Sequence, residues 1–98
     1  MKNILFHPEA ERELGFSAVY YEAESNGLGH RFLTQVERGL RRIVERPEAW
    51  PPLVSKRIRR YLLHDFPYAI VYKNDPETIF VLSIMHLSRK PGYWRNRG

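Results

Sequence analysis

The sequence contains no cysteine, and this absence excludes two kinds of small protein. A disulfide framework needs paired cysteines, and so does a thiolate zinc site. A chain of 98 residues without them fits a reducing compartment. No apolar run approaches the ~20 residues of a transmembrane helix, and residues 1–8 are interrupted too early for a signal peptide. We therefore expect a cytoplasmic protein without a membrane partner.

Acidic residues are scarce in the second half of the chain. Residues 1–50 hold eight acids and seven bases, whereas residues 51–98 hold three acids and nine bases. One interpretation is a surface for an anionic partner, either nucleic acid or an acidic protein segment; the other is a solvated basic surface. The two basic clusters are Lys56, Arg57, Arg59 and Arg60, and Arg89, Lys90, Arg95 and Arg97.

The first half of the chain has the apolar spacing of helices. One domain, residues 1–98, accounts for the length. Residues 4–6 predict a strand, and Pro8 suits the first position of a helix. Glycines near residue 28 separate two helical segments, and Pro47 ends the second, which predicts an antiparallel hairpin. The apolar stripes are Ala10, Leu14, Ala18 and Tyr21, and Phe32, Val36, Leu40, Ile43 and Val44.

Beyond the loop 47–52, the apolar pattern changes to a period of two. Residues 58–62, 68–72 and 79–85 predict three strands joined by short turns, and hence an antiparallel meander. The run 79–85 is apolar almost throughout, which indicates a central strand covered at least partly on both sides. The first strand must join one edge of this sheet, and the sequence does not say which. The predicted fold is a two-layer α+β domain of order β-α-α-β-β-β, with a helical hairpin packed on a small antiparallel sheet.

Side chains able to act on RNA gather in the second half. Cleavage by 2′-hydroxyl attack requires a base, an acid and cations that stabilise the phosphorane. Arginine binds phosphate oxygens, and histidine transfers protons near neutrality, whereas tyrosine does so only with a depressed pKa. The candidates for this chemistry are Arg59, Arg60, His86, Arg89 and Tyr93.

Each candidate also has a purely structural interpretation. Arginines on a strand are usually solvated, and His86 could cap the last strand through a local hydrogen bond. Tyr93 and Trp94 could tie the tail to the core instead of binding a partner. The helical glutamates are expected at the surface, so no carboxylate base is evident. The four histidines lack metal-ligand spacing, and no glycine-rich phosphate loop occurs, so we predict neither metal nor cofactor.

Two C-terminal segments resemble the RelE/ParE toxin superfamily: RRYLLHDFPYAIVY, residues 59–72, and HLSRKPGYWRNR, residues 86–97. The helical half adds the pieces YYE and GLG, the latter followed two positions later by Phe32. The resemblance covers nearly the whole chain. It implies a helical hairpin on a small twisted sheet, and a toxin neutralised by a cognate antitoxin. That partner would present an extended or helical, often acidic, segment to the basic face and to a groove beside the hairpin.

Members of the superfamily act by two different mechanisms, so the resemblance implies either of them for this chain. RelE-like members cleave messenger RNA on the ribosome with basic sheet residues and a C-terminal tyrosine or histidine, whereas ParE-like members are described as inhibitors of DNA gyrase. This sequence lacks a pair of strand lysines, and its ending resembles the ParE-like branch. We therefore favour a ParE-like toxin with a protein target; an RNA-cleaving RelE-like enzyme, or a member that keeps only antitoxin binding, remains the alternative. The binding residues expected are Lys56, Arg57, Tyr93, Trp94, Arg95 and Arg97.

Overall fold

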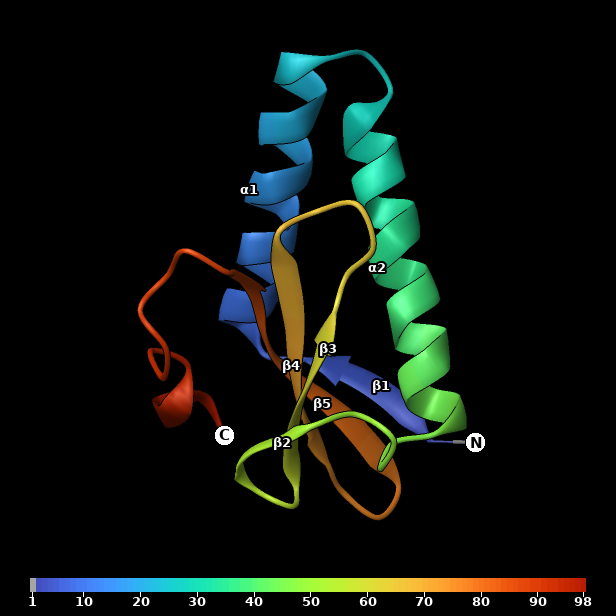
Figure 1. The fold of residues 1–98 in the computed structure, drawn as a ribbon, viewed down its shortest axis with the longest axis vertical. Helices are drawn as coiled ribbons and strands as arrows, with labels where there is room; N and C mark the ends of the chain where they lie inside the picture. Colours follow the sequence, from blue (N-terminus) through green and yellow to red (C-terminus); the bar gives the residue numbers. More distant parts are fainter. Residues whose placement is uncertain (1) are drawn as a thin grey trace.

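A computed structural model describes residues 2–98 and confirms the predicted α+β fold (Figure 1). Two antiparallel helices cover one face of a five-stranded sheet of order β1-β5-β4-β3-β2. Neither helix, nor any other helix of these residues, combines the length and apolar character of a membrane-crossing segment. The elements are β1 (Asn3–Phe6), α1 (Pro8–Glu24), α2 (Leu28–Glu45), β2 (Pro52–Ser55), β3 (Ile58–Leu62), β4 (Tyr68–Asn74), β5 (Thr78–His86) and a 3-10 turn, η1 (Arg95–Arg97).

The helical hairpin begins and turns where the sequence predicts. His7 Nδ1 accepts a hydrogen bond from the Glu9 backbone N–H at 3.0 Å, which caps α1 beside Pro8. At the turn, Gly27 adopts φ 85°, a left-handed conformation that favours glycine. The Glu22 carboxylate accepts hydrogen bonds from the backbone N–H groups of Gly27 and Gly29, at 2.9 and 3.0 Å. These bonds satisfy donors that the start of α2 leaves open.

The sheet contains two features that differ from the predicted meander. First, β1 pairs with β5 in parallel, with Ile4 opposite Ile79, so the sheet is mixed. Second, the segment after the expected loop forms an additional edge strand, β2, which pairs with β3. The predicted meander itself is confirmed, because β3, β4 and β5 pair in sequence and antiparallel. β5 lies between β1 and β4, as its apolar run predicts.

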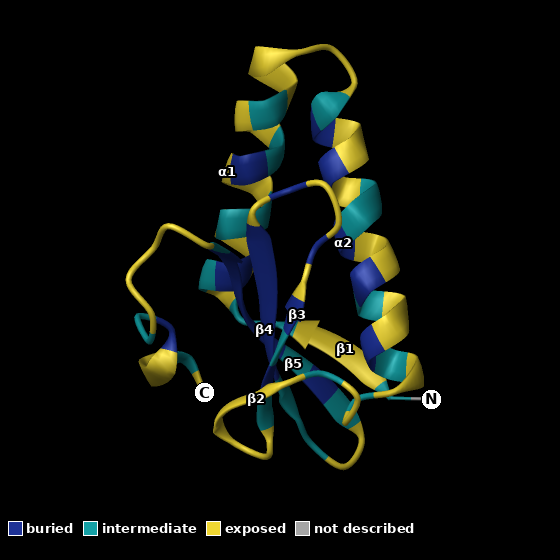
Figure 2. Cartoon of the chain, in the orientation of Figure 1, coloured by how far each residue is buried: buried dark blue, intermediate teal, exposed yellow. Residues whose placement is uncertain are grey.

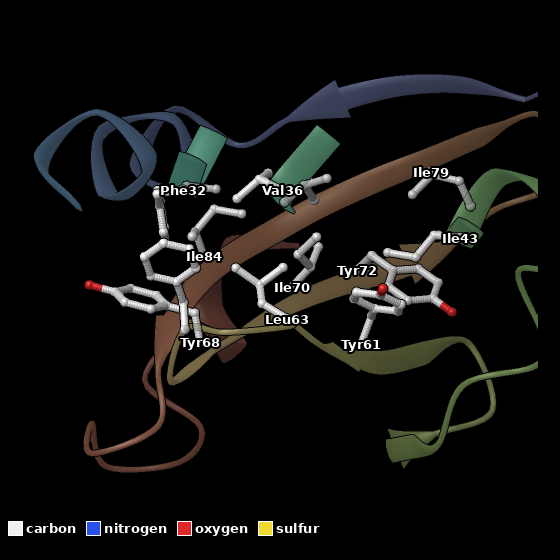
Figure 3. Packing of buried hydrophobic residues seen from close by; sticks show 13 residues of the cluster. Phe32, Val36, Ile43, Tyr61, Leu63, Tyr68, Ile70, Tyr72, Ile79 and Ile84 are labelled. Atoms are coloured by element: carbon white, nitrogen blue, oxygen red, sulfur yellow. The ribbon is translucent and has the colours of Figure 1, made fainter. Parts of the chain in front are cut away.

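The main core lies between the hairpin and the sheet (Figure 3). Phe32, Val36 and Ile43 of α2 are fully or almost fully buried against the sheet. α2 approaches β3 so closely that a Cβ atom on Gly39 would lie 2.7 Å from Cε1 of Tyr61. The predicted stripe of α1 also contributes, with Ala10 fully buried. The apolar stripes that the sequence predicts on both helices are therefore the faces that pack on the sheet.

The opposite face of the sheet has a smaller core that the C-terminal tail covers. Trp94 is 4% exposed and packs on Val71, Leu82 and Met85. Figure 2 shows β4 dark over most of its length, whereas the outward faces of the two helices are largely exposed. The tail therefore takes the place of a second helical layer, and it brings residues 89–97 beside the end of β5 (Figure 1).

Candidate functional site

Three of the five residues predicted for RNA chemistry line one hollow beside the end of β5. The hollow has a volume of about 200 Å³. Its walls come from α1, β4, β5 and the tail, so the fold gathers residues that are far apart in the sequence. The residues that line it are Glu13, Phe16, Ser17, Tyr68, Ile84, His86, Arg89 and Tyr93.

Arg89 and Tyr93 contact each other at this hollow. The guanidinium carbon of Arg89 lies 3.9 Å from the centre of the Tyr93 ring, a cation–π contact. Burial raises the pKa of Tyr93, and the nearby Glu13 carboxylate adds to this, whereas the Ser83 hydrogen bond and Arg89 act against it. The phenol therefore stays protonated at neutral pH and is a poor proton acceptor.

His86 is held by the turn that follows its strand. Its Nδ1 atom accepts a hydrogen bond from the Ser88 backbone N–H at 3.0 Å, and the Ser88 hydroxyl lies 2.7 Å away. Because Nδ1 accepts, the neutral ring carries its proton on Nε2. The ring also packs edge-on against Tyr68, with 4.9 Å between ring centres. In this arrangement His86 has no free nitrogen to accept a proton from a substrate.

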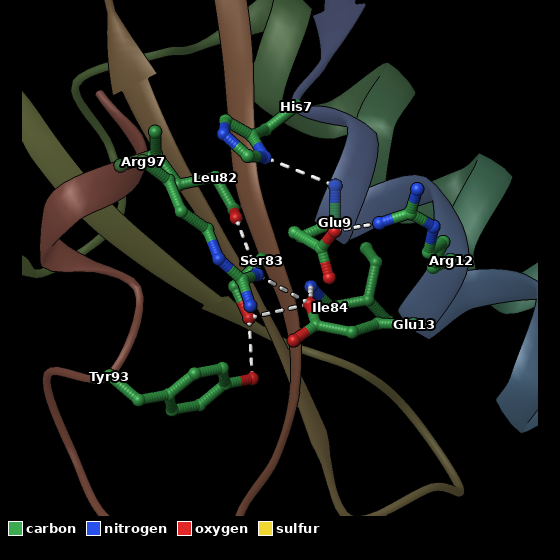
Figure 4. Close-up of polar contacts among 9 residues, drawn as sticks. All are labelled: His7, Glu9, Arg12, Glu13, Leu82, Ser83, Ile84, Tyr93 and Arg97. Carbon is green, nitrogen blue, oxygen red and sulfur yellow. Dashed lines mark hydrogen bonds and ion pairs between the residues drawn. The ribbon is translucent and has the colours of Figure 1, made fainter.

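Glu13 of α1 is the carboxylate of the hollow, and it closes the open edge of β5 (Figure 4). β1 pairs with β5 only as far as Val81, whereas β5 continues to His86. Beyond Val81, Glu13 Oε1 accepts hydrogen bonds from the Ile84 backbone N–H and the Ser83 hydroxyl, both at 3.0 Å. The carboxylate thus replaces the backbone acceptor that a further strand would provide.

Arg97 completes this arrangement from the tail (Figure 4). Its Nη1 atom donates to Glu13 Oε1 at 2.9 Å and to the Leu82 carbonyl at 3.0 Å. The Ser83 hydroxyl also lies 2.7 Å from the Tyr93 hydroxyl. We call Glu13, Ser83, Tyr93 and Arg97 the clasp, because together they fasten α1, β5 and the tail.

The arginines of β3 point to opposite faces of the sheet, as the alternation of the strand predicts. Arg59 is 9% exposed and lies under the helices, where its Nη1 atom donates to the carbonyls of Glu48 and Trp50 at 3.1 and 2.9 Å. Arg60 pairs in register with Val71 and shares the face that the tail covers. Arg59 is therefore occupied in holding the loop before β2, and only Arg60 shares a face with the tail.

The residues predicted for binding lie in several different environments. Arg57 forms an ion pair with Asp75, and Arg97 belongs to the clasp. Trp94 is buried in the second core, whereas Lys56 and Arg95 are exposed. The structure thus brings the tail and one strand arginine to one face, but it does not combine all the basic residues into a single surface.

Comparison with known proteins agrees with this architecture. The family model described as "ParE toxin of type II toxin-antitoxin system, parDE" matches residues 4–91. The chain belongs to this family. A chain of a solved structure, "Chromosomal ParDE TA system from P. aeruginosa", aligns with a TM-score of 0.65 over 89% of this chain and 97% of that chain. At 16% identity, this likeness shows the shared ParE fold. No curated protein matches the sequence.

Membership of the ParE family confirms the resemblance found in the two C-terminal segments and the helical half. The sequence did not predict two features of this ParE chain. The first is the contact of Glu13 with β5, because nothing in the local sequence signals it. The second feature is a row of exposed apolar residues on α1: Phe16, Val19 and Tyr20 are 76%, 71% and 58% exposed. Their spacing of three and four residues is a signal that could have revealed it.

Proposed function

We propose that this ParE toxin arrests growth in the cytoplasm by binding a protein target, DNA gyrase, without catalysing a reaction itself. The observation that carries the proposal is the hydrogen bonding of the Glu13 carboxylate. Its Oε1 atom receives three hydrogen bonds, from Ser83, Ile84 and Arg97, which hold the charged carboxylate in a structural role. A carboxylate fixed in this way cannot turn towards a substrate, as a general base must, without breaking these hydrogen bonds.

The other groups of the hollow support the same proposal. A general base must have a free acceptor atom within reach of the substrate. His86 uses Nδ1 to hold its own turn, and Tyr93 keeps its proton. Arg89, at the start of the tail, has an exposed guanidinium that a partner can contact. The hollow therefore has the character of a recognition site that combines one cation with aromatic surface.

The exposed apolar row on α1 supports neutralisation by an antitoxin. Phe16 lines the same hollow as Arg89, so apolar and cationic groups adjoin on the surface. An amphipathic helix of the antitoxin would bury Phe16, Val19 and Tyr20 and place its acidic residues near Arg89. The antitoxin would then cover the face that we propose for the target, which accounts for inhibition by direct occlusion.

Two assays with the same purified protein test the proposed function. The toxin should inhibit supercoiling of relaxed plasmid by gyrase, and added antitoxin should restore supercoiling. Primer extension on translated message should show no new ends. Unimpaired supercoiling at a large excess of toxin would contradict the gyrase proposal, and new ends that vanish in Arg89→Ala would favour the RelE-like alternative.

A further inference from the structure

The flank of α2 that faces away from α1 carries a row of arginines. Its members are Arg31, Arg38 and Arg42, and we call them the α2 arginine row. All three are exposed. Arg38 and Arg42 line a hollow of about 230 Å³ together with Gln35, His64 and Asp65. The row therefore borders the turn between β3 and β4, and it is separate from the hollow at the end of β5.

The two helices of the hairpin carry opposite charge. α1 has five glutamates and one arginine, whereas α2 has four arginines and two glutamates. One of these glutamates, Glu37, pairs with Arg41 outside the row, with 3.1 Å between Nη2 and Oε1. Within residues 2–98, Arg38 and Arg42 have no carboxylate within 4 Å. Their charge is thus available to an anionic ligand.

Asp65 is the carboxylate among the residues that line this hollow. It lies 3.9 Å from Arg31, and both side chains are more than half exposed, so this pair contributes little to stability. Asp65 adopts φ 67°, a conformation that asparagine also tolerates. The negative charge of Asp65 would repel an anion in the hollow, so removing this charge tests whether the hollow binds anions.

The chemistry of the row favours phosphate over a protein surface. Protein interfaces need apolar groups at their centre. The only large exposed apolar residue of α2 in the described chain is Leu33, and it lies with Ala18 and Val19 on the α1 side. Arginine, glutamine and histidine donors without apolar surface are instead typical of contacts to a nucleic-acid backbone.

We propose that the α2 arginine row binds the phosphate backbone of double-stranded DNA. From Arg31 to Arg42 the row spans roughly 16 Å at 1.5 Å per residue, and a DNA duplex presents about five phosphates per strand over that length. α2 has 18 residues and an exposed outward face, and an α-helix fits the major groove of B-form DNA but not that of A-form RNA. The row offers no aromatic side chain for stacking, as single strands require.

Fluorescence anisotropy with a labelled mixed-sequence duplex of about 24 base pairs tests the proposal, over about 50 to 200 mM salt. Three phosphate contacts predict that log K falls with log salt at a slope of about −2.7. Arg31→Ala/Arg38→Ala should reduce the slope by nearly 2 and weaken binding about tenfold or more at 0.1 M salt. Asp65→Asn should strengthen it. Arg42 is left intact, because it donates to the Tyr61 hydroxyl at 3.0 Å.

Lys90→Ala/Arg95→Ala is the matched control, because it removes the same charge from the tail. It should retain most of the affinity; an equal loss in both double variants would show that net charge alone drives binding and would overturn the proposal. Tighter binding of duplex RNA, of single-stranded DNA or of a glutamate-rich peptide would overturn it as well. The assay contains no gyrase, so its outcome is independent of the proposed target. Circular dichroism should show every variant folded.

Discussion

Glu13 and Arg97 are 84 positions apart in the sequence and meet in an ion pair at the edge of β5. Their side chains are 16% and 14% exposed, so the pair is largely removed from solvent. Each partner also satisfies a backbone group of β5: Glu13 accepts from Ile84 N–H, and Arg97 donates to the Leu82 carbonyl. The tail of the toxin is thereby attached to α1 through the sheet.

The first prediction concerns the stability that this pair contributes. Glu13→Ala should lower the free energy of unfolding by about 2–4 kcal/mol, because it leaves the Ile84 N–H without an acceptor and the Arg97 guanidinium without its carboxylate. Arg97→Ala should cost less, since Glu13 keeps two other donors. Glu11→Ala, at an exposed position of the same helix, is the control. Urea unfolding measures all three, and equal midpoints for Glu13→Ala and Glu11→Ala would contradict the clasp.

The second prediction separates the two strand arginines. Arg59→Met should lower the free energy of unfolding by about 2–3 kcal/mol, because the carbonyls of Glu48 and Trp50 lose their donor. Arg60→Met should change it by about 0.5 kcal/mol or less, as is usual away from buried networks. The same denaturation experiment applies to both. A larger effect at Arg60 would show that the roles are reversed.

The third prediction is a loss of stability in alkali. Burial raises the pKa of Tyr72 to about 12, although Arg59 opposes the rise. The unfolded chain ionises near the ordinary tyrosine value of about 10, so the contribution is complete below pH 10 and falls as the pH rises towards 12. Tyr72→Phe should flatten the pH dependence of the melting temperature between about pH 10 and 11.5. An unchanged profile in the variant would contradict this assignment.

The fourth prediction concerns the antitoxin. Phe16→Asp should weaken antitoxin binding about 30-fold or more, the effect of losing an interface hot spot. It should leave the fold intact, because Phe16 is 76% exposed. Leu53→Asp makes the same change on the edge strand β2 and should retain the affinity. Calorimetric titration with the antitoxin measures both, and unaltered binding by Phe16→Asp would place the interface elsewhere.

The fold could be predicted because its signals are local. Periodicity identified both helices, and Gly27 and Pro47 marked where they turn and end. The strand β2 was missed because Pro52–Ser55 has no alternation and pairs only through β3. The parallel pairing of β1 with β5 joins segments more than 70 residues apart, and no local pattern encodes such a choice.

The site was less predictable because its contacts join residues that are far apart in the sequence. The period of two in residues 58–62 implies that Arg59 and Arg60 point to opposite faces, but it does not show that Arg59 faces the helices and binds two carbonyls. Glu13 has the sequence context of an ordinary helical glutamate. Its role depends on where β1 stops along β5, which is a property of the assembled sheet.

The most direct test of a structural, non-catalytic Glu13 is a comparison of the wild-type toxin with Glu13→Gln. Glutamine keeps the side-chain shape and an acceptor for Ile84, but it cannot serve as a base at neutral pH. Both proteins should inhibit gyrase supercoiling to within roughly threefold, a difference below about 1 kcal/mol, and neither should cleave RNA. If the wild-type protein cleaves translated message and the folded Glu13→Gln variant does not, the account is contradicted.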